Sequence, residues 1–201
     1  MIETQFTLQK KLDIIFGDGS KRGPFFQGNK ISIPYLYVFH LRQYFNKRRH
    51  IHWQKDLDIL IDAALIHALY HELGHALINH YRLPVAGLEE DTVDNLSNLL
   101  LIAHTPNGEE LTRQAAMVFY LKSKRNQSVV KERYFWDEHR LSKQRYYSML
   151  CQLYGSDPKK HSALIKEKGF SDERAQKCVL EYRRMAQAWT QMLRPYWKPN
   201  S

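Results

Sequence analysis

The stretch LDILIDAALIHALYHELGHALINHY, residues 57–81, decides how this chain of 201 residues is organised. Its apolar side chains recur at steps of three and four, which is the period of an α-helix. No proline interrupts the run from Lys55 to Leu83, so one long helix is expected here. The positions that carry the pattern are Ile59, Ala63, Ile66, Leu69, Tyr70, Leu73, Ala76 and Leu77.

The same stretch contains the pentapeptide His71-Glu72-Leu73-Gly74-His75. Residues four apart lie one above the other on a helix, so both imidazoles can reach one ion, and a neutral histidine nitrogen is a standard Zn²⁺ ligand. Glu72 is rotated about 100° from His71, where a carboxylate can act as general base without binding the metal. The alternative is a buried helix whose histidines make only local hydrogen bonds.

A third ligand is expected downstream, because a catalytic zinc site usually has three protein ligands and one open position. The first helix should end near Pro84, since proline disfavours helix at the preceding residue. A second helix is expected from the acidic segment 89–94 to Ala103, joined to the first by a short loop and antiparallel to it. Glu90 and Asp94 lie on one face of this helix. We therefore assign Glu90 as the third ligand, and Asp94 as the carboxylate that fixes the tautomer of a ligating histidine.

The acidic segment also has a simpler interpretation. Acidic residues are favoured in the first turn of a helix because they face the positive end of its dipole, and this explains Glu89 and Asp91. If Glu90 does not bind the metal, Glu89 and Asp94 are the other candidate ligands.

These motifs resemble a gluzincin metallopeptidase, a clan that pairs H-E-x-x-H with a downstream E-x-x-x-D helix. The string HELGHALINHYRLPVAGLEEDTVDNLSNLL (residues 71–100), the segment 136–158 and the region around Arg174, Cys178 and Glu181 more specifically resemble an uncharacterised bacterial metallopeptidase family. The similarity begins near Leu12, but residues 16–30, FGDGSKRGPFFQGNK, depart from the family pattern. The resemblance implies a zinc peptidase with a zincin-like fold and a protein or peptide substrate, without identifying that substrate.

The N-terminal part favours a small sheet. The apolar run Leu12–Phe16 is closed by a turn signal at residues 17–19, and Lys30–Val38 alternates β-branched and aromatic residues as a strand does. Pro34 would confine the second strand to an edge. Such an edge could pair with an extended peptide substrate, or it could be an ordinary edge. A short helix is expected over Phe39–Asn46.

Helices dominate the rest of the chain. They are expected over residues 109–124, 142–154 and 171–193, with a break at 105–108 and a loop at 126–128. The predicted class is α+β, mainly α, with a small N-terminal β-sheet and a C-terminal helical part. Residues 1–201 are expected to form a single domain: a sheet region over about 1–50, metal-site helices over about 55–104, and C-terminal helices over about 109–195.

Other histidines have less certain roles. His139 is our candidate for stabilising an oxyanion, with Asp137 or Glu138 as its orienting partner, and Arg145 and Tyr146 are rivals. His139 could equally be a surface or structural residue. His67 is expected to be a core residue or a residue beside the site, because a fourth protein ligand would exclude water. His80 and His104 have no assigned role.

Composition narrows the alternatives. The chain is 43% hydrophobic, and it contains no apolar run long enough for a transmembrane helix and no signal-peptide pattern. A cytoplasmic location is therefore the default, or an exported one if a leader has been removed. The net charge of +9 permits nucleic-acid association, but the basic clusters at 47–50, 122–125 and 159–161 are short and carry no recognition motif.

The two cysteines, Cys151 and Cys178, fall on separate predicted helices. A disulfide between them is possible but cannot be deduced from sequence, and the family resemblance makes it more plausible. Three functions follow in order of preference: a zinc-dependent peptidase, a catalytically silent zinc-binding interaction protein on the same scaffold, and a basic nucleic-acid-associated protein.

Overall fold

The computed structural model describes residues 6–8, 10–17, 23–46, 57–125 and 137–198. The chain divides into two compact units. The first unit consists of Met1–Ser97 and Trp189–Ser201, and the second of Asn98–Ala188. The prediction of an α+β, mainly α protein with a small N-terminal sheet is confirmed. No helix in the described ranges has the length and apolar character that a membrane span needs.

The sheet of the first unit has three strands in the order β1-β3-β2: β1 (Asp13–Gly17), β2 (Phe25–Gln27) and β3 (Lys30–Pro34). Strand β3 runs parallel to β1 and antiparallel to β2. A two-residue turn joins β2 to β3, and Gly28 in that turn has a φ of 63°. Glycine adopts this left-handed conformation without the steric cost that a side chain would bring.

The predicted edge strand is wrong in two respects. The strand ends at Pro34 rather than Val38, and β3 is the central strand, so the edges belong to β1 and β2. The aromatic and β-branched residues after Pro34 form helix α2 (Tyr35–Asn46) instead. This helix buries Leu41 and Phe45, four residues apart, so packing of its inner face overrides local strand preference. The possible substrate-binding role therefore does not belong to residues 30–38 as an edge.

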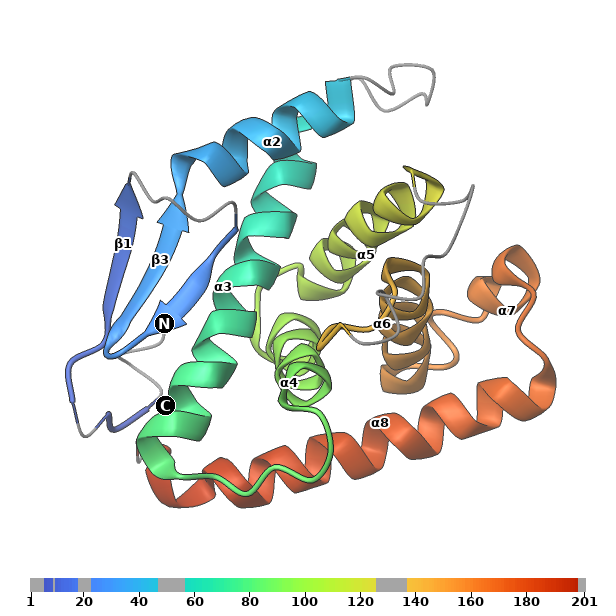
Figure 1. Cartoon of the computed structure of the whole chain (residues 1–201). Helices are drawn as coiled ribbons and strands as arrows, with labels where there is room; N and C mark the ends of the chain where they lie inside the picture. The colour runs from blue at the N-terminus through green and yellow to red at the C-terminus, as the bar shows by residue number, and fades with distance from the viewer. Residues whose placement is uncertain (1–5, 9, 18–22, 47–56, 126–136, 199–201) are drawn as a thin grey trace. The chain divides into compact units, whose positions relative to one another are not determined.

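Helix α3 (Leu57–Tyr81) is the main element of the first unit (Figure 1) and confirms the long helix expected from the sequence. Helix α2 and strands β2 and β3 contact it. Ile31 and Ile33 of β3 are fully buried, as are Leu73 and Leu77 of α3. Leu73 and Leu77 lie on the opposite side of α3 from His71 and His75, so the helix packs on this core with its two histidines facing away from it.

Helix α3 ends at Tyr81, close to the predicted stop. The backbone N–H of Leu83 bonds back to the carbonyl of Ile78, and Arg82 has a φ of 51°. Such a left-handed residue is a common way to end a helix. After the turn at Gly87, helix α4 (Glu89–His104) begins with the acidic segment. The boundary between the two units falls within α4, so Glu89 to Ser97 belong to the first unit.

Residues from both ends of the described chain contact each other in the first unit. Phe6 forms an isolated antiparallel bridge with Trp197, and their rings lie 5.4 Å apart. The Tyr81 hydroxyl donates to the carbonyl of Thr7 at 2.9 Å, and the Tyr81 ring stacks on Tyr196 at 3.7 Å. The end of α3 is therefore tied to segments that are distant in sequence.

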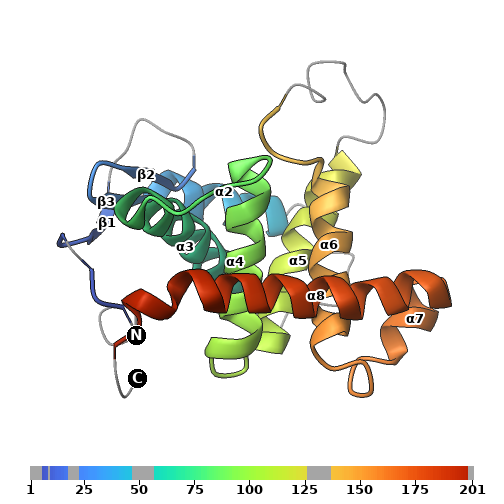
Figure 2. The same ribbon diagram turned by 90° about the horizontal axis from the view of Figure 1, so that it is seen from below.

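The second unit is helical. It contains α5 (Gly108–Arg125), α6 (Ser142–Ser156), α7 (Ala163–Lys168) and most of α8 (Asp172–Leu193), followed by a short 3₁₀ turn at Arg194–Tyr196 in the first unit. Helices α5 and α6 pack side by side (Figure 2). Helix α7 was not predicted. It is only six residues long, so it gives little periodic signal, and it is followed by Gly169, which has a φ of 68°. The predicted loop at 126–128 and the basic cluster at 47–50 lie outside the described residues.

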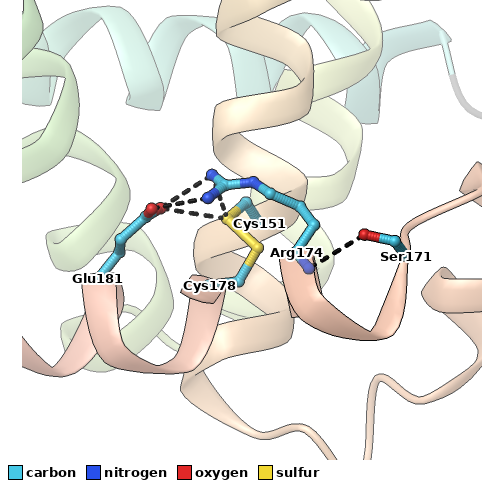
Figure 3. The surroundings of a disulfide bond; sticks show 5 residues. All are labelled: Cys151, Ser171, Arg174, Cys178 and Glu181. Atoms are coloured by element: carbon cyan, nitrogen blue, oxygen red, sulfur yellow. Dashed lines mark hydrogen bonds and ion pairs between the residues drawn. A yellow bond between two sulfur atoms is a disulfide. The ribbon is translucent and has the colours of Figure 1, made fainter. Parts of the chain in front are cut away.

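A disulfide joins Cys151 of α6 to Cys178 of α8, which resolves the pairing that the sequence left open (Figure 3). The Cα atoms are 5.1 Å apart, and both cysteines are buried. Arg174 donates two hydrogen bonds to the Glu181 carboxylate, at 2.6 and 2.8 Å, and its Nη2 lies 3.1 Å from the sulfur of Cys151. A bidentate ion pair between two residues of α8, Arg174 and Glu181, therefore lies beside the disulfide.

Candidate metal centre

The two histidines of the H-E-x-x-H motif point from α3 towards the start of α4. His71 is buried at 7% exposure, and the side chain of His75 is 18% exposed. Their ring centroids are 5.0 Å apart and the rings are nearly perpendicular. The spacing of four residues thus brings both imidazoles to one place, as a helix requires.

Glu90 of α4 lies opposite both rings. Its Oε2 is 3.0 Å from His71 Nε2, and its Oε1 is 3.4 Å from His75 Nε2. One ligand atom from each of these three residues lies within 4.8 Å of the others, which makes them the group in the described chain that could hold a metal ion. The structure thus brings the predicted ligand set together.

The other nitrogen of each ring faces its own carboxylate. Asp94 Oδ1 is 2.8 Å from His71 Nδ1, and Glu89 Oε1 is 2.7 Å from His75 Nδ1. An ionised carboxylate only accepts hydrogen bonds, so each Nδ1 carries the proton. In a neutral imidazole the Nε2 atom then presents a lone pair.

This arrangement suits a cation. With protons on both Nδ1 atoms, two Nε2 lone pairs and a carboxylate would face one another at hydrogen-bond distance. That is repulsive unless positive charge lies between them. Protonating the rings supplies such charge, and so does a metal ion bound through Nε2 of His71, Nε2 of His75 and Glu90. The nitrogen and oxygen donors match the usual ligands of Zn²⁺.

The carboxylates around His75 favour positive charge on its ring. Burial lowers the pKa of a histidine, but hydrogen bonds to Glu90 and Glu89 outweigh burial here, and the pKa of His75 is raised above 6.5. A metal ion would replace this proton, so protons and metal compete for the same nitrogen.

Two contacts hold α4 close to α3. Gly74, inside the motif, faces Val93 of α4 with no room for a side chain. The hydroxyl of Ser97 donates to the backbone carbonyl of His67 at 3.0 Å, and both residues are buried. His67 therefore lies in the core between the helices one turn before His71, in keeping with a core role rather than that of a fourth ligand.

Glu72 is buried beside the candidate ligands, at 8% exposure. Burial raises its pKa above 4.5. The nearby histidines and a hydrogen bond from the backbone N–H of Phe26 act in the opposite direction without cancelling that effect. Strand β2 thus supplies a backbone donor to the predicted general base.

His139 belongs to the second unit. Its backbone N–H donates to Asp137 Oδ1 at 2.9 Å, and its Nδ1 is 3.4 Å from the same oxygen. His139 thus contacts Asp137, one of the two predicted orienting partners, and the orienting role itself stays a prediction. The rivals also lie in this unit: the Arg145 guanidinium stacks 4.2 Å above Phe119, and burial raises the pKa of the Tyr146 hydroxyl to about 12. The oxyanion role of His139 stays a prediction.

Two contacts of the site were not anticipated. Glu89 was explained as a helix N-terminal residue or a spare ligand, yet its carboxylate meets His75 Nδ1. The doublet Glu89-Glu90 was the available signal, because a histidine ligand needs a partner for its second nitrogen. The Phe26 donor was missed because β2 is only three residues long. His80, which had no assigned role, packs edge-on against the ring of Phe26.

A family model described as "Putative metallopeptidase" matches residues 1–193. No curated protein and no solved structure matches the chain.

Proposed function

This chain belongs to that metallopeptidase family, and on this premise we propose that it is a zinc-dependent peptidase of the gluzincin type. His71, His75 and Glu90 would hold the ion, and Glu72 would be the general base. The observation that carries the proposal is the convergence of two Nε2 atoms and one carboxylate within 4.8 Å, beside a buried carboxylate that is not in the ligand group. A purely structural metal site has no need of that additional carboxylate.

The chemistry of the ion follows from the ligand set. A bound Zn²⁺ with three protein ligands supplies Lewis-acid activation of a water molecule and of the scissile carbonyl. The chain's own residues then have separate tasks. Asp94 and Glu89 would hold the imidazoles in the tautomer whose Nε2 atom carries the lone pair that binds a metal. Glu90 contributes a negative charge that offsets the charge of the ion.

Glu72 would move the proton. Its carboxylate takes a proton from the attacking water and delivers it to the nitrogen of the departing amine, so that it begins and ends the cycle ionised. Burial and the raised pKa of Glu72 favour this task, because a carboxyl group with a higher pKa is a stronger base. The Phe26 N–H keeps the carboxylate oriented between turnovers.

His139 would donate a hydrogen bond to the oxyanion as the peptide carbonyl is attacked. Its contact with Asp137 supports this role, because a carboxylate beside Nδ1 can orient the ring. His139→Ala should lower kcat by about 100-fold, with unchanged metal content. If kcat is unchanged in His139→Ala, Arg145 and Tyr146 become the candidates for the oxyanion donor.

The deciding experiment compares wild type with Glu72→Gln and Glu90→Ala. Zinc content is measured by elemental analysis, and cleavage is measured on unfolded protein and on a fluorogenic peptide library. Wild type should bind about one zinc per chain and cleave. Glu72→Gln should keep its zinc and lose cleavage, and Glu90→Ala should lose both. Bound zinc with no cleavage of any substrate would instead favour a silent zinc-binding interaction protein. Absence of bound zinc in wild type would overturn the proposal.

The net charge of +9 suggests a separate test of nucleic-acid association. Binding to duplex DNA that weakens steeply with salt would support that alternative function. We expect no such binding at physiological salt, because no recognition motif accompanies the basic clusters.

A further inference from the structure

Glu89 is the first residue of α4, where an acidic side chain is ordinarily explained by the helix dipole. Its carboxylate does more than face the helix end, because Oε1 lies 2.7 Å from His75 Nδ1. That is as short as the 2.8 Å contact between Asp94 and His71 Nδ1. Each histidine of the metal centre therefore has its own carboxylate partner.

The position of Glu89 excludes it as a ligand in this arrangement. The two nitrogens of an imidazole lie on different edges of the ring, and Glu89 occupies the Nδ1 edge of His75. The candidate ligand atom of Glu90 lies on the Nε2 edge of the same ring. A carboxylate bound at Nδ1 cannot also reach an ion held at Nε2, although it can fix the ring for that ion.

We infer that Glu89 is a positioning residue of the metal centre, which orients His75 as Asp94 orients His71 and thereby raises the affinity of the site for zinc. The inference rests on the proposed function, because it takes His75 as a zinc ligand. A carboxylate on Nδ1 fixes the tautomer, aims the Nε2 lone pair and makes the imidazole a better donor. Loss of such a partner typically lowers metal affinity by about 10–100-fold.

The two partners should not contribute equally. The side chain of Glu89 is 48% exposed, whereas that of Asp94 is 16% exposed. Solvent screens the exposed interaction and competes for its hydrogen bond. Glu89→Ala should therefore weaken zinc binding by about tenfold, and Asp94→Ala by about 100-fold, the two ends of the range for such partners.

The test is zinc affinity of the full chain, measured from the metal-free protein by competition with a chromophoric chelator. Glu89→Gln keeps an oxygen that accepts from Nδ1–H but removes the charge, so it should recover most of the affinity lost in Glu89→Ala. Asp91→Asn removes an equal charge from the same first turn of α4 and serves as the matched control. It should bind zinc as wild type does.

A second measurement separates ring orientation from helix stability. Co²⁺ replaces zinc as a spectroscopic probe, and its visible absorption reports the geometry of the ligands. The Co²⁺ spectrum of Glu89→Ala should differ from wild type, while Glu89→Gln should reproduce it. The unfolding temperatures of the metal-free proteins should be similar for Glu89→Ala, Glu89→Gln and Asp91→Asn.

The outcomes are distinguishable. Equal zinc affinity and equal Co²⁺ spectra in wild type and Glu89→Ala would overturn the inference and leave the metal centre intact. Equal losses in Glu89→Ala and Asp91→Asn would also overturn it, because the helix dipole would then explain the effect. Absence of metal binding in wild type would overturn the proposed function, and this inference with it.

Discussion

Gly74 of α3 lies directly against Val93 of α4, so closely that a Cβ atom added at Gly74 would be 2.8 Å from the Val93 Cβ. The fourth residue of the H-E-L-G-H motif is therefore a point of close contact between the two site helices. Gly74→Ala should push α4 away, weaken zinc binding at least tenfold and destabilise the fold by about 1–3 kcal/mol. Zinc titration and thermal unfolding measure the two effects.

Gly23 provides the matched control for this substitution. It also lies in the first unit, and a Cβ added there would meet nothing within 4 Å. Gly23→Ala should leave both zinc affinity and the unfolding temperature close to wild type. If Gly74→Ala behaves like Gly23→Ala, the close approach of the two helices is not what builds the site.

Strand β2 gives a prediction about pH. The Phe26 N–H lowers the pKa of Glu72, and proline at position 26 removes that donor on an edge strand, where proline is tolerated. The pKa of Glu72 should then rise further above its usual value. Because the base must be ionised, the acid limb of the pH profile for kcat/KM should move to higher pH in Phe26→Pro.

The variant Phe26→Ala distinguishes the effect of the backbone N–H on Glu72 from the effect of the Phe26 ring. This variant keeps the N–H but loses the ring that packs on His80. Its acid limb should match wild type, whatever its effect on stability. A shift of equal size in both variants would show that the aromatic ring, rather than the amide, controls Glu72.

The disulfide closes a loop of 27 residues in the second unit. On the loop-entropy model, such a cross-link stabilises the folded state by about 3.5 kcal/mol. The Cys151→Ala/Cys178→Ala double variant should lose about this much in a denaturation experiment. Its zinc affinity should be retained, because His71, His75, Glu90 and Asp94 belong to the first unit. Loss of zinc binding would show that the two units are energetically coupled.

Lys122 of α5 should make stability depend on pH in the alkaline range. Burial, with the guanidinium of Arg145 nearby, lowers the pKa of Lys122 to about 8 from 10.5. Between these two values the unfolded chain binds more protons than the folded chain, so stability should rise as pH rises through this window. Lys122→Met should stabilise the protein at pH 7, and the gain should shrink towards pH 10. The exposed Lys124 is the control, and Lys124→Met should show no such trend.

The sequence was most informative where the helical pattern of apolar residues continues over many turns. The helix over 57–81 follows from its repeated apolar steps, and Glu90 and Asp94 follow from the spacing of their own helix together with a short connection. These are local relationships, and the turn between the helices limits how they can pack. The convergence of His71, His75 and Glu90 was therefore predictable before any three-dimensional information.

The errors came from contacts that join distant segments. Residues 35–38 have side chains that favour a strand, but burial of Leu41 and Phe45 selects a helix for the whole segment. Strand β2 has three residues, and its pairing with β3 decides that β3 is central. The doublet Glu89-Glu90 is a sequence signal for a partner of His75, but it does not decide the matter, because Glu89 suits the helix dipole equally well.

The discontinuous make-up of the first unit has a consequence for the order of folding. Its residues come from two segments, 1–97 and 189–201, with all of the second unit between them in sequence. During synthesis, the metal-centre residues are made long before Tyr196 and Trp197. The ring of Tyr196 stacks on Tyr81, and the ring of Trp197 packs against Phe6. The helical second unit can form from contiguous chain, whereas the first unit must wait for its last segment. We therefore expect the nascent protein to gain zinc affinity late, after its helical second unit has already folded.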